Sequence, residues 1–118
     1  MAYPKHGRGR VALALVTLSA TVGLLPAAKA APVRPPKVHT VVMNKMVYGP
    51  APSGVRAGDV ILWVNKDIFR HTATARDKSF NVDLPAGKSA RTVVQKPGVI
   101  SYFCRYHPGM KGQLAVAK

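Results

Sequence analysis

Three side chains that bind soft metal ions lie close together near the end of the chain. Cys104, His107 and Met110 follow one another at intervals of three residues, and a Pro-Gly pair between the last two excludes a continuous helix. One tight loop can therefore present all three to a single ion. His71 supplies a fourth ligand from a segment that follows a predicted strand and a short turn. The predicted site places His71, Cys104 and His107 in a trigonal plane, with Met110 as a weak axial ligand.

The donor types of this set favour copper. A thiolate and a thioether stabilise Cu(I), whereas imidazoles retain Cu(II), so the set suits one copper ion that alternates between the two states. Zinc also binds Cys and His, but a thioether is a poor ligand for it. A Cys/His nucleophile pair is the enzymatic alternative, and no Asn, Asp or Gly-rich oxyanion segment is placed to complete it. We therefore expect a copper protein that is not an enzyme.

The first thirty residues have the pattern of a secretory signal peptide. A basic start is followed by an apolar run over residues 11–25 and by Ala28-Lys29-Ala30, a small-x-small cleavage site. We expect general secretion, with cleavage near Ala30 and no stable membrane insertion afterwards. A retained anchor is the alternative, but an apolar run of fifteen residues falls short of the roughly 20 that span a bilayer. The basic residues of the start are Lys5, Arg8 and Arg10.

Cleavage would leave residues 31–118, which is enough for one small domain. Residues 31–36 contain three prolines and are expected to form a mobile leader, and residues 37–118 to form the copper-binding domain. Cys104 is the only cysteine, so a disulfide within the chain is impossible. A lone thiol in an oxidising compartment needs a partner, and its neighbouring ligands indicate that this partner is a metal.

The exported part of the chain is strongly basic. It holds all four Asp residues and fourteen of the eighteen Lys and Arg residues, which gives a net charge of +10 with neutral histidines. Such a charge favours association with acidic redox partners, or electrostatic contact with anionic surfaces. Nucleic acid is a poor candidate, because export removes the protein from it and the basic residues are scattered singly. We expect a monomer.

Short apolar runs separated by Gly and Pro turns predict an all-β sandwich or barrel, with no helix after the signal. In the last run before the ligand loop, alternation places Ile100, Tyr102 and Cys104 on one face, so the sulfur is expected at the edge of the core. The predicted strands are Val38 to Met43, Met46 to Tyr48, Gly54 to Arg56, Val60 to Asn65, His71 to Ala75, Phe80 to Leu84, Ala90 to Gln95, Val99 to Phe103 and Gln113 to Ala117.

From Met43 to Lys118 the chain resembles a cupredoxin, and most closely an amicyanin. The resemblance rests on residues 44–48, on 57–65, on His71, and on the loop Cys-Arg-Tyr-His-Pro-Gly-Met-Lys-Gly over 104–112, which has two residues in each gap between ligands. It implies a Greek-key β-sandwich, one type 1 copper and outer-sphere electron transfer in the periplasm. It also implies His71, Cys104, His107 and Met110 as the copper ligands.

The sequence departs from that family after the first histidine. The family commonly has Asn there, which braces the ligand loop, whereas Thr72 offers only a hydroxyl. The segment between His71 and Cys104 is also shorter than in the methylamine-linked amicyanins, so the resemblance does not imply pairing with methylamine dehydrogenase.

Other residues have simpler interpretations. We expect His39 to be an edge or surface histidine and Trp63 to be a core residue. Four turn residues are candidates for an apolar rim around the exposed edge of His107, or they only shape turns: Pro50, Pro52, Pro108 and Gly109.

These observations leave two functions of different classes. The first is a periplasmic electron shuttle that exchanges single electrons with acidic partners through His107. The second is a carrier or storage protein that delivers copper to another cuproprotein. A carrier would more often use several Met and His residues on an open surface, and the sequence has only four methionines and no Met-rich run. Oxidase or reductase activity is the weakest option, since a substrate-binding copper needs an open position.

Overall fold

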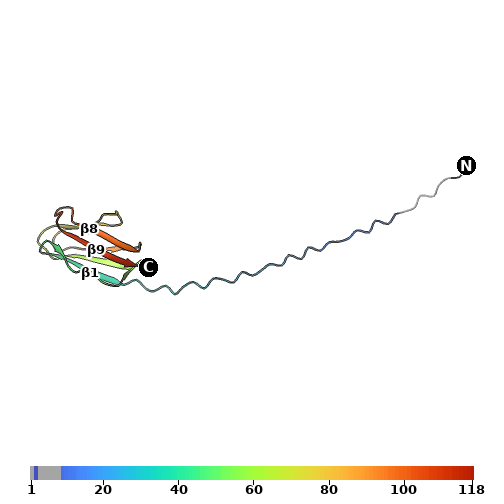
Figure 1. Ribbon diagram of the computed structural model, residues 1–118, viewed down its shortest axis with the longest axis horizontal. Coiled ribbons are helices and arrows are strands. Elements are labelled where there is room, and N and C mark those ends of the chain that lie inside the picture. Colours follow the sequence, from blue (N-terminus) through green and yellow to red (C-terminus); the bar gives the residue numbers. More distant parts are fainter. Residues whose placement is uncertain (1, 3–8) are drawn as a thin grey trace. The chain divides into compact units, whose positions relative to one another are not determined.

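Nine short strands in two sheets form the part of the chain that carries the predicted ligands (Figure 1). The computed structural model describes residue 2 and residues 9–118, so Lys5 and Arg8 of the predicted signal lie outside the described residues. The strands are β1 (Val38–Asn44), β2 (Val47–Tyr48), β3 (Val55–Arg56), β4 (Val60–Asn65), β5 (His71–Ala75), β6 (Asn81–Leu84), β7 (Ser89–Val93), β8 (Gly98–Phe103) and β9 (Lys111–Ala117).

The chain divides into two compact units, Met1–Pro32 and Val33–Lys118. In the first unit, the described residues form no helix or strand, and the apolar run over residues 11–25 is exposed. Among the described residues, no helix is long and apolar enough to cross a membrane. The second unit contains all nine strands.

The two sheets confirm the predicted β-sandwich. One has the order β2-β1-β4-β7 and the other β3-β9-β8-β5-β6. In Figure 1, β8 and β9 run side by side in one layer while β1 belongs to the other. The chain crosses between the sheets: β4 and β7 pair in the first sheet, whereas β5 and β6, which lie between them in sequence, pair in the second. Each predicted apolar run corresponds to one of these strands, and no helix occurs in the described residues.

Aromatic side chains fill the core between the sheets. Trp63 is fully buried, as predicted, and its ring lies 5.1 Å from that of Tyr102 and 5.4 Å from that of Phe80. The ring of Tyr48 packs against Tyr102 at 4.8 Å. Each pair gains from offset or edge contacts in addition to the apolar area it buries. Tyr102 lies near the end of β8, two residues before Cys104, and both side chains are buried, so this aromatic cluster lies beneath the predicted site.

A buried carboxylate holds the end of the sandwich where β4 begins. Asp59 accepts hydrogen bonds from the guanidinium of Arg34 at 2.8 Å, the backbone N–H of Lys37 at 3.0 Å and that of Arg56 at 3.0 Å. His39 Nε2 lies 2.9 Å from the same carboxylate. His39 is therefore remote from the ligand cluster, as expected, but it is largely buried by this contact rather than a surface residue. The ion pair of Arg34 also attaches the Pro-rich segment to the domain.

The other end of β4 leads to the ligand-bearing segments. There β1 turns into β2 through Lys45 and Met46, whose φ angles of 51° and 63° lie in the left-handed region. Residues other than Gly, Asn and Asp seldom adopt such φ angles, so the turn needs support from its surroundings. The Met46 N–H donates to the carboxylate of Asp67 at 2.9 Å. This bond connects the strained turn to the loop that precedes His71.

Candidate metal centre

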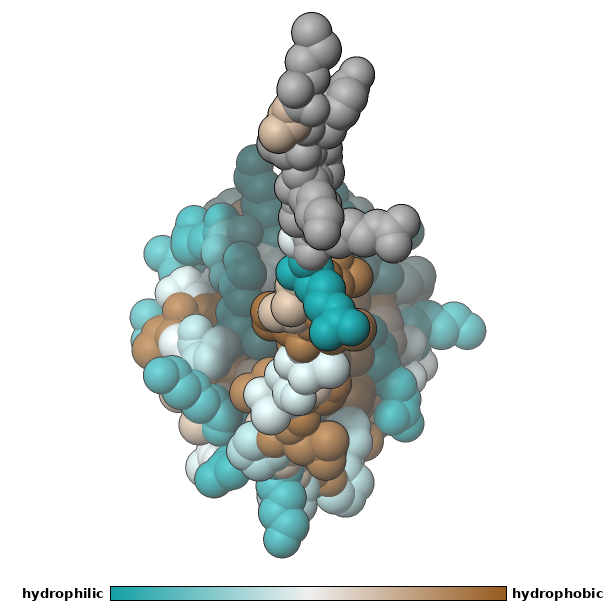
Figure 2. All heavy atoms as spheres, turned by 90° about the vertical axis from the view of Figure 1, so that its right-hand side faces the viewer, coloured by the Kyte–Doolittle hydropathy of each residue, from teal (hydrophilic) through white to brown (hydrophobic). Residues whose placement is uncertain are grey.

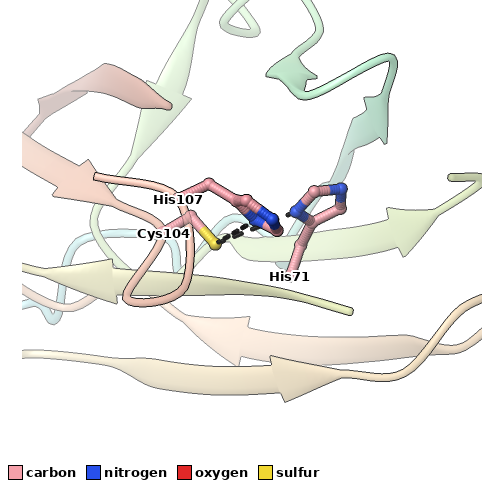
Figure 3. Close-up of side chains that lie close together, drawn as sticks. All are labelled: His71, Cys104 and His107. Atoms are coloured by element: carbon pink, nitrogen blue, oxygen red, sulfur yellow. Dashed lines mark hydrogen bonds between the residues drawn. The ribbon is translucent and has the colours of Figure 1, made fainter. Parts of the chain in front are cut away.

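His71, Cys104 and His107 meet at one end of the sandwich with their donor atoms turned toward one another (Figure 3). His71 begins β5, whereas Cys104 and His107 lie in the loop between β8 and β9. The Cys104 Sγ is 3.8 Å from His71 Nδ1 and 3.7 Å from His107 Nδ1, and all three donor atoms lie within 4.8 Å of one another. The structure therefore places His71, which is distant in sequence, beside the two candidate ligands of the loop.

The separations between these donor atoms match those expected around one ion. A thiolate about 2.3 Å and an imidazole nitrogen about 2.0–2.1 Å from a metal lie about 3.8 Å apart when the angle between them is about 120°. The observed sulfur–nitrogen distances are 3.8 and 3.7 Å. These two sulfur–nitrogen distances are therefore compatible with a single ion held by all three side chains.

Asp67 determines which nitrogen of His71 faces the sulfur. Its carboxylate lies 3.0 Å from His71 Nε2. The hydrogen bond from His71, with a second from the Met46 N–H, lowers the pKa of Asp67 to about 2, so the carboxylate is ionised and acts only as an acceptor. Nε2 must then carry the proton, and in the neutral ring Nδ1 presents a lone pair toward Cys104. Carboxylate–histidine pairs of this kind orient metal ligands and raise their basicity.

Cys104 is prepared to act as a thiolate. Its side chain is fully buried, and burial alone would raise the pKa of the thiol. The backbone N–H of Thr72, 3.3 Å from the sulfur, acts against burial because it stabilises the thiolate, and the pKa of the thiol is lowered. A buried thiolate surrounded by donors and two imidazoles is a ligand rather than an exposed redox thiol.

Thr72 braces the ligand loop although it cannot offer an amide. Its hydroxyl oxygen accepts the N–H of Arg105 at 2.9 Å, in the residue next to Cys104. The same hydroxyl lies 2.9 Å from the hydroxyl of Thr74, which in turn donates to Asn81 at 2.8 Å. Since the Thr74 hydrogen is used on Asn81, the Thr72 hydroxyl is the donor in the pair. The sequence offered only a hydroxyl at this position, and the structure shows that this hydroxyl belongs to a hydrogen-bonded chain that supports the loop.

The ligand loop is closed by its own backbone. The N–H of Cys104 donates to the carbonyl of Met110 at 3.1 Å, and the N–H of Met110 donates to that of His107 at 2.9 Å. Met110 is buried at the end of this loop. Immediately afterwards, Gly112 lies against the ring of Tyr102, where an added Cβ would be 2.4 Å from a ring carbon. The absence of a side chain at Gly112 thus lets the first residues of β9 pack directly against the Tyr102 ring.

Comparison with known proteins agrees with this arrangement. The family model of the cupredoxin-like domain matches residues 11–116. The chain belongs to the cupredoxins. The fold and the three positioned ligands together provide a site for one copper ion. No curated protein matched the sequence.

Several solved structures share this cupredoxin fold. A purple cupredoxin from Nitrosopumilus maritimus is 24% identical, with a TM-score of 0.61 over 66% of this chain and 98% of its own. Amicyanin from Paracoccus versutus is 23% identical, with a TM-score of 0.58 over 70% of this chain and 84% of its own. A copper-containing nitrite reductase from Thermus scotoductus is 30% identical, with a TM-score of 0.59 over 78% of this chain but only 25% of the enzyme.

Two apolar residues that the sequence interpretation overlooked lie beside the cupredoxin site. Ile68 is 82% exposed, and the ring of the half-exposed Phe69 lies 6.1 Å from that of His107. His107 itself is half-buried. Of the four residues considered for an apolar rim, three are exposed and Pro52 is half-buried. The available signal was an Ile-Phe pair in an otherwise polar loop just before His71.

Asn65 and Asp67 were also overlooked as supports of this loop. The buried amide of Asn65 donates to the carbonyl of Phe69 at 2.7 Å and to that of Leu84 at 3.0 Å. Its side-chain oxygen accepts the N–H of Asp67 at 2.9 Å. Asn65 thereby fixes the path of the chain from β4 to His71. A polar residue at the end of an apolar strand was visible in the sequence, but its partners depend on the fold.

Proposed function

We propose that this cupredoxin is a periplasmic electron shuttle with a type 1 copper centre. One copper would be held by His71, Cys104 and His107, with Met110 as the weak axial ligand. The observation that carries the proposal is the buried Cys104 Sγ with two imidazole Nδ1 atoms at 3.7 and 3.8 Å. Bound copper supplies a one-electron couple between Cu(I) and Cu(II).

The surroundings of the ligands support electron transfer rather than catalysis or copper delivery. Catalytic metal sites keep a position open for substrate, whereas this set, with Met110, would saturate the ion. His71 and Cys104 are both fully buried, which limits exchange of the metal with an acceptor protein. The Thr72 N–H donates to the Cys104 sulfur, and His71 donates to the Asp67 carboxylate. These two hydrogen bonds hold the ligands in one arrangement, so little movement accompanies a change of oxidation state.

Electrons would enter and leave through the half-buried ring of His107, beside Phe69. The other two ligands of the plane are fully buried, so His107 offers the shortest path to a partner. The net charge of +10 over residues 31–118 favours an acidic redox partner, and the rate of exchange should fall as salt screens the attraction. On the face shown in Figure 2, hydrophilic side chains are spread around the domain rather than gathered in one patch.

The proposed location and domain limits come from the N-terminal sequence. Residues 1–30 would act as a signal peptide cleaved near Ala30, residues 31–36 as a leader, and residues 37–118 as the functional domain. The apolar run and the Ala-Lys-Ala site support export by general secretion. Mass measurement of the protein from the periplasm would test this, with a start at Ala31 expected and a retained N-terminus contradicting it.

The visible absorption spectrum of the copper-loaded protein tests the proposed centre. Charge transfer from the Cys104 thiolate to Cu(II) should give an intense band toward the red end of the spectrum, and Cys104→Ser should abolish it. The band should disappear and return through repeated reduction and oxidation with the metal retained. A colourless Cu(II) protein would exclude a type 1 centre, and rapid loss of copper to an acceptor would favour a carrier.

A further inference from the structure

Two arginines and a tyrosine form a cluster beside the predicted copper site. Arg70 precedes the ligand His71, and Arg105 and Tyr106 lie between the ligands Cys104 and His107. The two guanidinium carbons lie 6.0 and 5.8 Å from the centre of the Tyr106 ring, within the range of cation–π contacts. Their side chains remain 56% and 43% exposed. We refer to Arg70, Arg105 and Tyr106 as the arginine–tyrosine cluster.

A single acidic residue on β6 holds this cluster in place. Asp83 accepts hydrogen bonds from Arg70 Nε at 2.7 Å, from the Tyr106 hydroxyl at 2.7 Å and from Arg105 Nη2 at 3.4 Å. Those bonds, that of Arg70 first, lower the pKa of Asp83, so its carboxylate is ionised at neutral pH. One carboxylate shared by two guanidiniums leaves the group with one net positive charge. Asp83 therefore holds both arginines in position while the cluster keeps a net positive charge.

The cluster lies next to the route by which electrons would leave. Its residues are sequence neighbours of three ligands, and the exposed Ile68 and Phe69 continue the same surface from Arg70 to the ring of His107. An apolar centre with cationic residues at its border can exclude water close to the redox group while orienting a partner of opposite charge. Both features are present within a few residues of His107.

The chemistry of the cluster favours carboxylates as its ligands. A guanidinium presents donors in a planar fork that matches a carboxylate. Each arginine uses one of its nitrogens to donate to Asp83, which leaves its other nitrogens able to donate to a partner. Because the arginines are held in position, less side-chain entropy is lost when a partner binds. We propose that the arginine–tyrosine cluster is the docking site for the carboxylates of an acidic redox protein. This inference rests on the proposed electron-transfer function and assigns its partner to one surface.

Oxidation of the Cu(I) protein by an anionic reagent tests whether charge acts at this surface. The rate constant with ferricyanide is measured by stopped flow for the copper-loaded wild type and for Arg70→Gln/Arg105→Gln. At low ionic strength we expect the double variant to react about tenfold more slowly, with the difference lost at high salt. The matched control is Arg56→Gln/Arg91→Gln, which removes the same charge from exposed positions on β3 and β7 and should change the rate less than about twofold.

A cationic oxidant, tris(phenanthroline)cobalt(III), distinguishes loss of electrostatic attraction for an anion from damage to the copper centre. It should react with the cluster variant at least as fast as with the wild type. If ferricyanide oxidises the cluster variant and the control variant equally slowly, the proposal is overturned, because total charge would then account for the lower rate. A cluster variant that reacts more slowly than the wild type with both oxidants would also overturn the proposal, because the substitutions would then have damaged the copper centre. A wild type without the intense visible band would instead contradict the proposed function, so the two failures are distinguishable.

Binding measurements distinguish a carboxylate partner from an anionic surface. Amide chemical shifts of the Cu(I) protein are recorded with poly-L-glutamate and, separately, with phosphatidylglycerol vesicles. We expect poly-L-glutamate to shift the amides of Arg70, Arg105 and Tyr106 in the wild type but not in the cluster variant. Vesicles that perturb these amides while poly-L-glutamate does not would overturn the assignment to an acidic protein.

Discussion

The carboxylate of Asp67 lies 3.0 Å from Nε2 of His71, on the side of the ring away from Cys104. Its side chain is only 8% exposed, and the same oxygen accepts the N–H of Met46. One buried anion therefore sets the tautomer of a metal ligand and supports the left-handed turn between β1 and β2. The metal site and the outer hairpin are joined through two hydrogen bonds.

Replacement of Asp67 should weaken copper binding and raise the reduction potential. Asp67→Ala removes the acceptor that orients His71, and loss of such a partner costs about 10–100-fold in metal affinity. Loss of the negative charge also favours Cu(I) over Cu(II). Competitive Cu(I) titration and voltammetry measure the two effects. The control Asp77→Asn, in the turn between β5 and β6, should change neither quantity; equal effects of the two substitutions would contradict a specific role of Asp67.

Thr72→Val should destabilise the protein, whereas Thr72→Ser should not. Valine keeps the shape but removes the hydroxyl that accepts the Arg105 N–H, which leaves a partly buried donor unpaired at a cost of about 1–3 kcal/mol. Serine retains that acceptor. Denaturant unfolding of the metal-free variants gives the free energies. If valine and serine behave alike, the hydroxyl does not brace the loop.

Met110 is expected to tune the copper rather than to retain it. Met110→Leu preserves a buried apolar side chain of similar size but removes the weak axial thioether. The intense visible band should persist because the thiolate and both imidazoles remain, while the reduction potential should rise as the sulfur donor is lost. A variant that binds no copper, or one with an unchanged potential, would contradict the axial assignment.

The sequence predicted the strands and the ligand cluster because both depend on local patterns. Alternating residues placed Cys104 on the buried face with Tyr102, and the spacing of the loop brought His107 next to it. The supports of the site depend instead on contacts across the sandwich. Asp67 bonds to the β1–β2 turn, and Thr72 bonds to a loop that lies more than thirty residues later. Neither partner can be read from the types and spacing of nearby residues.

Acid should remove the stabilisation that Asp59 provides. Burial alone would raise the pKa of Asp59, but the hydrogen bonds from Lys37, His39, Arg56 and Arg34 outweigh it and hold the pKa well below its ordinary value. A group with a lowered pKa in the folded state stabilises the protein above its unfolded pKa of about 3.9 and loses that contribution as the pH falls below it.

The difference in unfolding free energy between the wild type and Asp59→Asn measures this contribution. It should be constant between about pH 5 and 7 and shrink steadily from about pH 4 downward. Asp77→Asn serves as the control at an exposed turn, where the pKa of the carboxyl is also lowered, first by the Ser79 hydroxyl. A difference for Asp59→Asn that grows toward acid would show that the carboxylate destabilises the folded state.

Gly112→Ala should damage the domain more than Gly109→Ala, although both glycines lie close to Met110. A Cβ at position 112 would be 2.4 Å from a carbon of the Tyr102 ring, and that ring is confined by Tyr48 and Trp63. The ring cannot move without disturbing the core, so we expect a loss of about 1–3 kcal/mol in unfolding free energy. At position 109 a Cβ meets nothing within 4 Å, so that variant should keep the stability of the wild type. Thermal and denaturant unfolding of the two metal-free variants provide the comparison, and equal stabilities would mean that the start of β9 can shift away from Tyr102.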